Sequence, residues 1–400
     1  MTVKLYENNS LLKSCQAVVT ACTESKGKYL IELDQTVFFP EGGGQLSDKG
    51  IISDAKVAHV AEKNGHILHE CDKPLAVGSM VEAKLDWMVR LDRMQQHLGE
   101  HILSYAFWKL FKANNVGFHM NEDNVTIDLD KEMTPEELLK AEHLTNEIIW
   151  DNRPVSVNYM DSTELEAHKN EMRKFNDKLT GILRIVSVEG ADICTCCGTH
   201  PPFTGMVGSV KIIRSDKHKN GCRVEFLCGR RALLDADKKN NILLSVAADF
   251  SAKPEQVPER LAKLHKEVEE LYEQLKAKTL ALLERGLEDK LAEAALRADG
   301  SKLLVMALTD DGKESKLLMP RLMTLTNTVS VIFSVQSERI SYVLVLGADT
   351  SGDCRTYIKI VNEIFAGRGG GKPDCAQGGA PYCDDWQDKL EKAKNALLKI

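Results

Sequence analysis

Two short segments rich in histidine and cysteine constrain this chain more than any other feature. The first segment reads Met94-Gln95-Gln96-His97-Leu98-Gly99-Glu100-His101. It lies in a stretch whose apolar residues recur every three to four positions, which predicts a helix over residues 90–115. His97 and His101 then share one face of that helix. Seen alone, such a pair is more often a polar helix face than a metal site.

The second segment follows a strand predicted over residues 181–189 and reads Cys194-Thr195-Cys196-Cys197-Gly198-Thr199-His200. Zinc takes imidazole nitrogen and thiolate sulfur in tetrahedral sites. The histidine pair supplies two such ligands and a Cys-x-x-x-His turn supplies two more, so the segments together predict one Zn²⁺ site. Cys196 is the first choice of thiolate and Cys197 the alternative. Four protein ligands are typical of a closed structural site, whereas catalytic zinc keeps a position for water or substrate; both interpretations stay open.

The cysteine content and the net charge narrow the class of protein. Eleven cysteines are an odd number, and no secretory signal precedes them. This favours reduced thiols, so we expect a cytoplasmic protein. No apolar run approaches the length of a membrane span. The net charge of −7 argues against a nonspecific polyanion coat, although a local basic patch is enough to bind nucleic acid.

A chain of 400 residues is too long for one ordinary core, so we predict an α+β multidomain protein. The expected parts are a small β-barrel with a glycine motif (1–89), an α/β zinc-binding core (90–250), a helical linker or coiled coil (251–298) and a glycine-rich α/β domain (299–400). Within the core we expect helices at 135–150, capped by Thr134, and at 163–178, with strands at 204–214 and 222–229. In the last domain we expect strands at 302–308, 329–335 and 342–347 and helices at 316–326, 355–365 and 385–398.

The linker is predicted from leucines spaced by three and four among dense Glu and Lys, from Leu261 to Leu275. Gly286 is expected to break this helix. A solvated helical spacer explains the pattern as well as a dimer interface does.

Two glycine-rich segments and one basic turn are candidate binding elements. Three glycines precede Gln45 and permit positive φ or a close backbone approach, although a tight hairpin explains them equally well. The second segment, Gly367–Gly379, has no strand directly before it and is neither a Rossmann nor a P-loop motif. Its backbone amides suit a phosphate or ribose, and a structural turn is the alternative. The candidate nucleic-acid-binding residues are Lys211, Arg214, Lys217, Lys219, Arg223, Gly369, Gly370 and Gly371.

The order of four motifs along the chain resembles that of the editing and C-terminal regions of alanyl-tRNA synthetase. These motifs are the glycine motif from Thr36, the histidine pair, the Cys196–His200 turn with the following Thr204-Gly-Met-Val-Gly, and the last glycine segment. With no aminoacylation region before them, the chain resembles the long form of the AlaX-type alanyl-tRNA editing proteins. Threonyl-tRNA synthetase editing domains share the zinc half-motifs, so the Gly-Gly-Gly-Gln motif and the C-terminal domain narrow the resemblance to alanine. Cys197 stands where the family usually has glycine.

The resemblance implies a zinc-dependent, ATP-independent aminoacyl-tRNA hydrolase that acts in trans on tRNA-Ala mischarged with serine, and often with glycine. It implies one Zn²⁺ held by His97, His101, Cys196 and His200. Thr36 would contact the serine hydroxyl, so that alanine leaves buried polar groups unpaired, and Gln45 would orient the ester or the water. The C-terminal domain would help to bind tRNA or, with the linker, form a homodimer. The alternatives are a noncatalytic tRNA-binding or assembly protein with structural zinc, and an editor of another tRNA such as the threonyl one.

Overall fold

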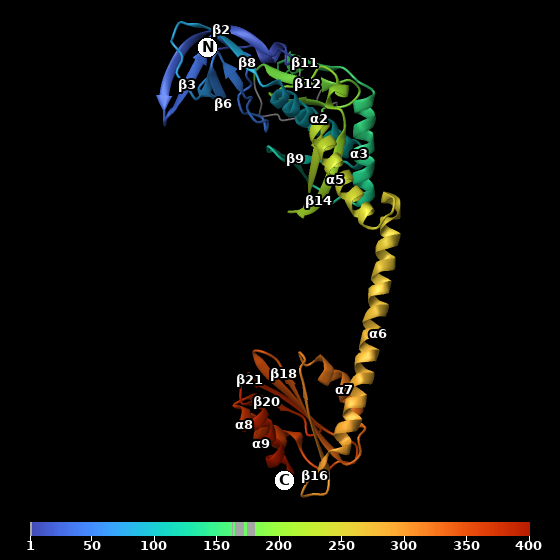
Figure 1. The fold of residues 1–400 in the computed structure, drawn as a ribbon. Helices are drawn as coiled ribbons and strands as arrows, with labels where there is room; N and C mark the ends of the chain where they lie inside the picture. Colours follow the sequence, from blue (N-terminus) through green and yellow to red (C-terminus); the bar gives the residue numbers. More distant parts are fainter. Residues whose placement is uncertain (1, 162, 165–171, 174–180) are drawn as a thin grey trace. The chain divides into compact units, whose positions relative to one another are not determined.

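The computed structural model describes residues 2–161, 163–164, 172–173 and 181–400. The chain divides into two compact units, Met1–Ser245 and Val246–Ile400. Both units combine helices with sheets, which confirms the prediction of an α+β multidomain protein (Figure 1). The finer division into four parts stays a prediction. The helix expected over residues 163–178 falls mostly outside the described residues.

Helices long and apolar enough to cross a membrane are absent from the described part of the chain.

The N-terminal strands of the first unit close into a barrel in the order β2-β3-β7-β6-β5-β8 (Figure 1). The bounds are β2 (Ser14–Ser25), β3 (Lys28–Leu33), β5 (Gly50–Ile52), β6 (Ala55–Lys63), β7 (His66–Cys71) and β8 (Met80–Leu85). Alternate residues point inward, as Val81, Ala83 and Leu85 do on β8, because successive side chains of a strand face opposite sides. Outside the barrel, β1 (Val3–Lys4) precedes α1 (Leu5–Asn8) and pairs in parallel with β4 (Gln35–Thr36). The glycine motif lies between β4 and β5.

The histidine pair lies on α2 (Trp87–Phe111), which begins where the Asp86 side chain accepts hydrogen bonds from the first free amides. Together with α3, this helix packs against a four-stranded antiparallel sheet in the order β14-β15-β10-β9. The bounds are β9 (Asn115–Met120), β10 (Val125–Leu129), α3 (Pro135–Trp150), β14 (Val210–His218) and β15 (Gly221–Cys228). The structure confirms α3 as predicted, with Thr134 and Glu137 forming a capping box.

A second sheet leads into the cysteine–histidine turn through β11 (Val155–Met160), β12 (Leu183–Val188) and β13 (Ile193–Thr195). The strand expected at 204–214 begins only at Val210. A 3₁₀ turn, η1 (Thr204–Val207), comes first because the Thr204 hydroxyl bonds the end of α3 at Ile148 O, and Gly208 then turns the chain at positive φ. Helix α5 (Gly229–Asp249) was not predicted, because its apolar residues occur in consecutive runs and are largely exposed.

The second unit is built on a six-stranded mixed sheet in the order β16-β17-β18-β19-β21-β20. Helices α8 and α9 pack on one face, and α7 with the end of α6 packs on the other (Figure 1). The predicted strands and helices are present with shifts of a few residues. The bounds are η2 (Pro254–Gln256), α6 (Val257–Ala292), β16 (Ala295–Leu296), β17 (Lys302–Leu308), α7 (Lys313–Met323), β18 (Thr328–Val335), β19 (Arg339–Leu346), α8 (Cys354–Phe365), β20 (Arg368–Gly371), β21 (Cys375–Pro381) and α9 (Trp386–Leu398).

Two expectations for this unit were wrong. Helix α6 runs through Gly286 without a break, because Leu283 and Leu287 on either side are buried against the sheet. That packing outweighs the cost of about 1 kcal/mol for a glycine in a helix. The segment Gly367–Gly379 is a β-hairpin rather than a loop, with β20 paired to β21. A Cβ on Gly369 or Gly371 would collide with the backbone of β21, so strand pairing itself requires these glycines.

Candidate metal centre and its cavity

Four side chains from two distant segments meet inside the first unit. His97 and His101 come from α2, and Cys196 and His200 come from the turn after β13. Their donor atoms all lie within 4.8 Å of one another. The Cys196 Sγ atom is 3.4 Å from His97 Nε2 and 3.3 Å from His200 Nε2. Cys197 is exposed and takes no part in this cluster, so the geometry favours Cys196 over Cys197 as the thiolate ligand.

Hydrogen-bond partners of the outer ring nitrogens orient two of the imidazoles toward the cluster. His97 Nδ1 lies 2.8 Å from Gln45 Oε1, and His101 Nδ1 lies 3.1 Å from Asp192 Oδ2. Each outer nitrogen therefore faces an acceptor, which leaves Nε2 free to bind a metal. Metal-binding histidines ordinarily show this arrangement. Three imidazole nitrogens and one thiolate are also a donor set that Zn²⁺ accepts, so the residues present fit zinc.

The electrostatics of the cluster favour the metal-binding form of the thiol. Burial raises the pKa of Cys196, but the His97, His200 and His101 imidazoles outweigh it and hold that pKa well below its usual value. Burial also lowers the pKa of His200, to about 3, although the charge of the Cys196 thiolate opposes this shift. A thiolate and a neutral imidazole are the species that coordinate metals.

A cavity of about 350 Å³ opens beside the cluster, a volume that suits a small ligand group. Its wall includes His97, His101 and Cys196. The Phe118 ring covers one side of His97, with ring centroids 5.5 Å apart and planes inclined by 28°. The remaining lining residues are Gly43, Glu100, Asn115, Val116, Gly117, Arg173, Cys194 and Thr195.

Gln45 lies next to the cluster, but its amide is already engaged within the protein. The Oε1 atom accepts a hydrogen bond from Thr199 N at 3.0 Å and faces His97, and Nε2 donates to Thr199 Oγ1 at 2.8 Å. The structure thus places Gln45 as a residue that positions His97, rather than one that touches an ester. Its predicted catalytic role stays a prediction.

Thr36 does not belong to the cluster of four metal-binding candidates and does not line the cavity. The residue is fully buried, and its hydroxyl lies 2.9 Å from His69 Nε2 and accepts a bond from Phe38 N at 3.1 Å. Because His69 Nδ1 faces Ile31 O at 2.9 Å, the proton sits on Nδ1 and the threonine hydroxyl donates to Nε2. One lone pair on Thr36 Oγ1 remains for a further donor.

Several residues that support the site were missed in the sequence. Asp192 orients His101, and Thr199 holds Gln45. A Cβ on Gly198 would collide with the His97 ring, so this glycine lets the turn approach the helix. The glycine stood inside the predicted turn, which was the available signal. Nothing local in the sequence pairs Asp192 with His101, because the two lie 91 residues apart.

The candidate nucleic-acid-binding residues fall in two places. In the first unit, four of the five basic residues already have carboxylate partners, which reduces the charge left for phosphates. The pairs are Lys211–Glu142 at 2.7 Å, Arg214–Glu225 at 2.7 Å, Lys217–Glu132 at 2.6 Å and Arg223–Asp128 at 2.6 Å. The fifth, Lys219, lies at the tip of the β14–β15 hairpin.

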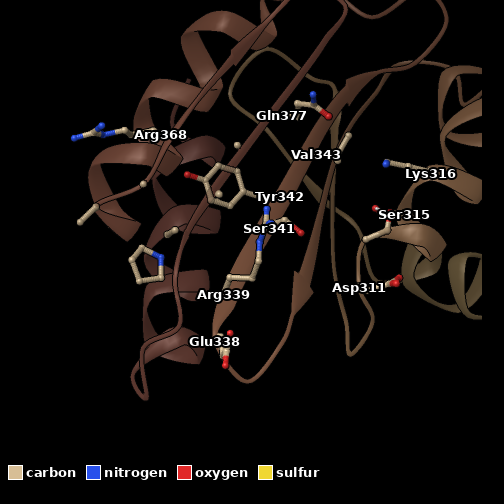
Figure 2. Close-up of a pocket in the computed structure, with 17 residues that line it drawn as sticks. Asp311, Ser315, Lys316, Glu338, Arg339, Ser341, Tyr342, Val343, Arg368 and Gln377 are labelled. Carbon is tan, nitrogen blue, oxygen red and sulfur yellow. Dashed lines mark hydrogen bonds between the residues drawn. The ribbon is translucent and has the colours of Figure 1, made fainter. Parts of the chain in front are cut away.

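The three candidate glycines lie on β20 of the second unit, near a larger cavity of about 1020 Å³. Figure 2 shows its floor of β19 and β21 side chains, with Arg339, Ser341 and Gln377, facing the start of α7 at Lys316. Gly369, Gly370 and Gly371 do not line it. Of the three, only Gly370 has open space around a built Cβ, so strand packing does not explain that glycine.

The sequence is 32% identical over 276 residues to the alanyl-tRNA editing protein AlaX-L of Pyrococcus horikoshii, an alignment that covers 66% of this chain and 67% of that relative. The chain belongs to the AlaX-L family of alanyl-tRNA editing proteins. In this AlaX-L family member, residues 183–225, which include the cysteine–histidine turn, match the threonyl and alanyl tRNA synthetase second additional domain. Residues 5–89 match the class II (A) tRNA synthetases.

Other relatives of this AlaX-L family member are similar over part or all of the chain. The alanyl-tRNA editing protein Aarsd1 of Mus musculus is 32% identical over 235 residues, 57% of each chain. The alanine–tRNA ligase of Pyrococcus furiosus is 27% identical over 412 residues, which span 99% of this chain and 44% of the ligase. The chain therefore spans less than half the length of such ligases. The C-Ala domain of Aquifex aeolicus alanyl-tRNA synthetase matches 26% of the chain at 22% identity, with a TM-score of 0.24.

Proposed function

We propose that this AlaX-L family member is a zinc-dependent aminoacyl-tRNA deacylase that acts in trans on Ser-tRNA-Ala, with Gly-tRNA-Ala as a second substrate. The observation that carries the proposal is the cluster of four metal-binding side chains in the wall of a cavity of about 350 Å³. Family membership supports tRNA-Ala as the RNA partner. We further propose that Lys219, at the tip of the β14–β15 hairpin, and Gly370, where an added Cβ would meet open space, contact this RNA.

The chain's own residues prepare the site for ester hydrolysis. When bound, zinc would supply Lewis acidity to the ester carbonyl and its attacking water. Gln45 and Asp192 fix His97 and His101 with Nε2 toward the cluster. Phe118 covers His97 and keeps water from that side of the cavity. For Thr36 to recognise a serine hydroxyl, the free lone pair of its Oγ1 would have to become accessible from the cavity.

A deacylation assay tests the proposal. The purified protein with one zinc per chain is expected to release serine from Ser-tRNA-Ala and to leave Ala-tRNA-Ala intact. Replacing His97 or His101 by Ala should remove the metal and the activity together, because each loses one of four ligands. Equal hydrolysis of both substrates would sink the claim of specificity. Full metal content and activity in either variant would contradict the proposed ligand set.

A second candidate is a noncatalytic tRNA-binding or assembly protein with structural zinc. The complete set of four protein ligands favours it, because catalytic zinc usually keeps an open position. A protein that holds stoichiometric zinc and binds tRNA-Ala without releasing serine would support this candidate. Residues 183–225 are similar to a domain of both threonyl and alanyl tRNA synthetases, so Ser-tRNA-Thr belongs in the same assay.

The apolar side chains of α6 support a homodimer as the proposed assembly. Leu261, Leu264, Val268, Leu271 and Leu275 follow the three-and-four spacing of a coiled coil, and each is at least 42% exposed.

A further inference from the structure

The cavity beside the metal centre contains a carboxylate that the proposed chemistry does not yet use. Glu100 precedes His101 on α2, is 5% exposed and lines the cavity wall. Its Oε1 atom accepts hydrogen bonds from Ser104 Oγ at 2.6 Å and from Asn115 Nδ2 at 2.7 Å. Asn115 Nδ2 also donates to Ser104 Oγ at 3.0 Å. Ser104 and Asn115, bonded to one another, thus hold the carboxylate in one orientation.

Only one oxygen of Glu100 is engaged in this way. Within the described chain, the Oε2 atom accepts no hydrogen bond, and it lies 3.9 Å from Nε2 of His101, the nitrogen that faces the metal cluster. A buried carboxylate is costly unless a cation or a set of donors accompanies it. The hydrogen-bond donors bind Oε1, and the nitrogen that approaches Oε2, His101 Nε2 at 3.9 Å, is directed at the metal cluster, so Oε2 remains available to a cation that enters the cavity.

No other described residue of the cavity wall carries a carboxylate. The nearby guanidinium of Arg173 is already paired with Asp192, at 3.0 Å between Nε and Oδ1. The histidines are directed at the metal cluster. A ligand that brings a cation into this cavity would therefore meet Glu100 as its natural counter-charge.

Every aminoacyl ester with a free amine brings such a cation. The α-amine lies two bonds from the ester carbonyl and is mostly protonated at pH 7, since α-amino groups have pKa values near 8. We propose that the Glu100 carboxylate binds the α-ammonium group of the aminoacyl substrate and thereby places the ester carbonyl beside the metal centre. This inference rests on the proposed deacylase function, and it names Glu100 as a substrate-binding residue with Ser104 and Asn115 as positioning residues.

A matched pair of substrates isolates this contact. Seryl-tRNA-Ala carries the α-ammonium, and the 2,3-dihydroxypropanoyl ester of the same tRNA replaces the amine by a neutral hydroxyl of similar size. The variant Glu100→Gln keeps an oxygen for Ser104 and Asn115 but loses the charge. The kcat/KM of the variant on the seryl ester should fall about 10- to 100-fold, as expected for one charged hydrogen bond. Its kcat/KM on the dihydroxypropanoyl ester should stay within about twofold of wild type. This ester has no ammonium group, so the substitution removes none of its binding contacts.

Zinc content and a second variant distinguish the alternatives. Wild type and Glu100→Gln should each hold one zinc per chain. The control Glu70→Gln changes a barrel carboxylate paired with Lys28 and should match wild type on both esters. If Glu100→Gln fails to fold, Glu100→Asp serves instead. This variant keeps the negative charge but moves it away from the cavity by one methylene, so it should lose part of the preference for the seryl ester. An equal loss on both esters would show that Glu100 acts on the reacting ester, and loss of zinc would show a role in metal binding. Either result, or unchanged kinetics, would overturn the inference.

Binding separates this inference from the proposed function. A nonhydrolysable 3′-amide analogue, 3′-seryl-amino-adenosine, and its neutral α-hydroxy counterpart can be titrated by calorimetry whether or not the protein is an enzyme. A wild-type protein that prefers the amine by about tenfold, with the preference lost in Glu100→Gln, supports the ammonium contact even if no ester is hydrolysed. Equal affinity of wild type for the two analogues contradicts it even if deacylation is found.

Discussion

At the scale of single residues, the site depends on how closely the backbone approaches a histidine. Gly198 lies against the His97 ring, and the same ring is held by Gln45. The turn therefore has no room for a side chain between the two elements that supply the metal-binding residues. A functional role for this glycine follows from the shape of the site rather than from any chemistry of its own.

We predict that Gly198→Ala displaces His97 and lowers zinc occupancy well below one per chain. The reason is the collision of the added methyl with the imidazole ring, which cannot move without losing Gln45. Metal analysis of the purified variant checks this. The control Gly286→Ala adds a methyl into open space within α6 and should retain full zinc, with helix stability improved by about 1 kcal/mol. A fully metallated Gly198→Ala protein would refute the argument.

A second residue-scale prediction concerns His69, which bonds Thr36 inside the barrel. Burial lowers its pKa from 6.5 to about 4. The unfolded imidazole takes up a proton below about pH 6.5, whereas the native one stays neutral until about pH 4. As the pH drops from about 6.5 to about 4, protonation of His69 in the unfolded state should therefore lower the free energy of unfolding by about 3 kcal/mol. Above pH 6.5 this loss is absent.

Urea unfolding of wild type and His69→Gln between pH 4 and 7.5 measures this term. The difference in stability between the two proteins should shrink toward acid pH, because Gln does not titrate. Parallel pH dependences would contradict a buried neutral His69.

At the scale of elements, a buried ion pair joins α2 to the segment that carries the glycine motif. Arg90 and Asp48 are 0% and 1% exposed. The guanidinium donates to Asp48 and also to Ser10 O at 2.9 Å and Val37 O at 2.6 Å. The helix that bears the histidines is thus attached to the segment between β4 and β5 that carries the glycine motif.

Because the pair is buried, removing one partner leaves the other charge without compensation. We predict that Arg90→Ala lowers the free energy of unfolding of the first unit by about 3 to 5 kcal/mol, as for other broken buried pairs. Denaturant titration followed by circular dichroism measures it. The exposed pair of Lys73 with Asp54 is the control, and Lys73→Ala should leave the unfolding midpoint unchanged. An Arg90→Ala protein as stable as wild type would contradict a stabilising role for the buried pair of Arg90 and Asp48.

Elements also show what the sequence could and could not predict. Helix α3 was predicted at its bounds because its periodicity, Pro135 and the Thr134–Glu137 capping box all act locally. The sequence predicts a glycine-rich binding segment or turn where β20 and β21 form a hairpin, because glycine-rich strands carry no side-chain alternation and their pairing depends on long-range packing. The metal-binding candidates were found because two local motifs complement one another. The sequence does not indicate the roles of Asp192 and Arg90, because their partners His101 and Asp48 lie 91 and 42 residues away.

At the scale of the whole molecule, the candidate metal centre lies entirely in the unit Met1–Ser245. The unit Val246–Ile400 has its own two hydrophobic clusters around a separate sheet. The stability of the two units should therefore respond differently to the metal.

We predict that a zinc chelator lowers the melting temperature of the first unit and leaves that of the second unchanged. A ligand that binds only the native state at 1,000 times its Kd stabilises it by about 4 kcal/mol, and chelation removes that contribution. Calorimetry should resolve two transitions, of which only one moves with the chelator and returns with added zinc. A shift of both transitions, or of neither, would rule out zinc binding confined to the first unit.

The arrangement of the thiols has a practical consequence. Of the eleven cysteines, only Cys197 is exposed, and it directly follows the thiol of the metal cluster in the chain. A maleimide dye at limiting concentration should react there first, without any engineered cysteine. The natural sequence thus offers a site for a fluorescent reporter one residue from Cys196 of the metal cluster, through which occupancy of the site can be followed in real time on the unaltered protein.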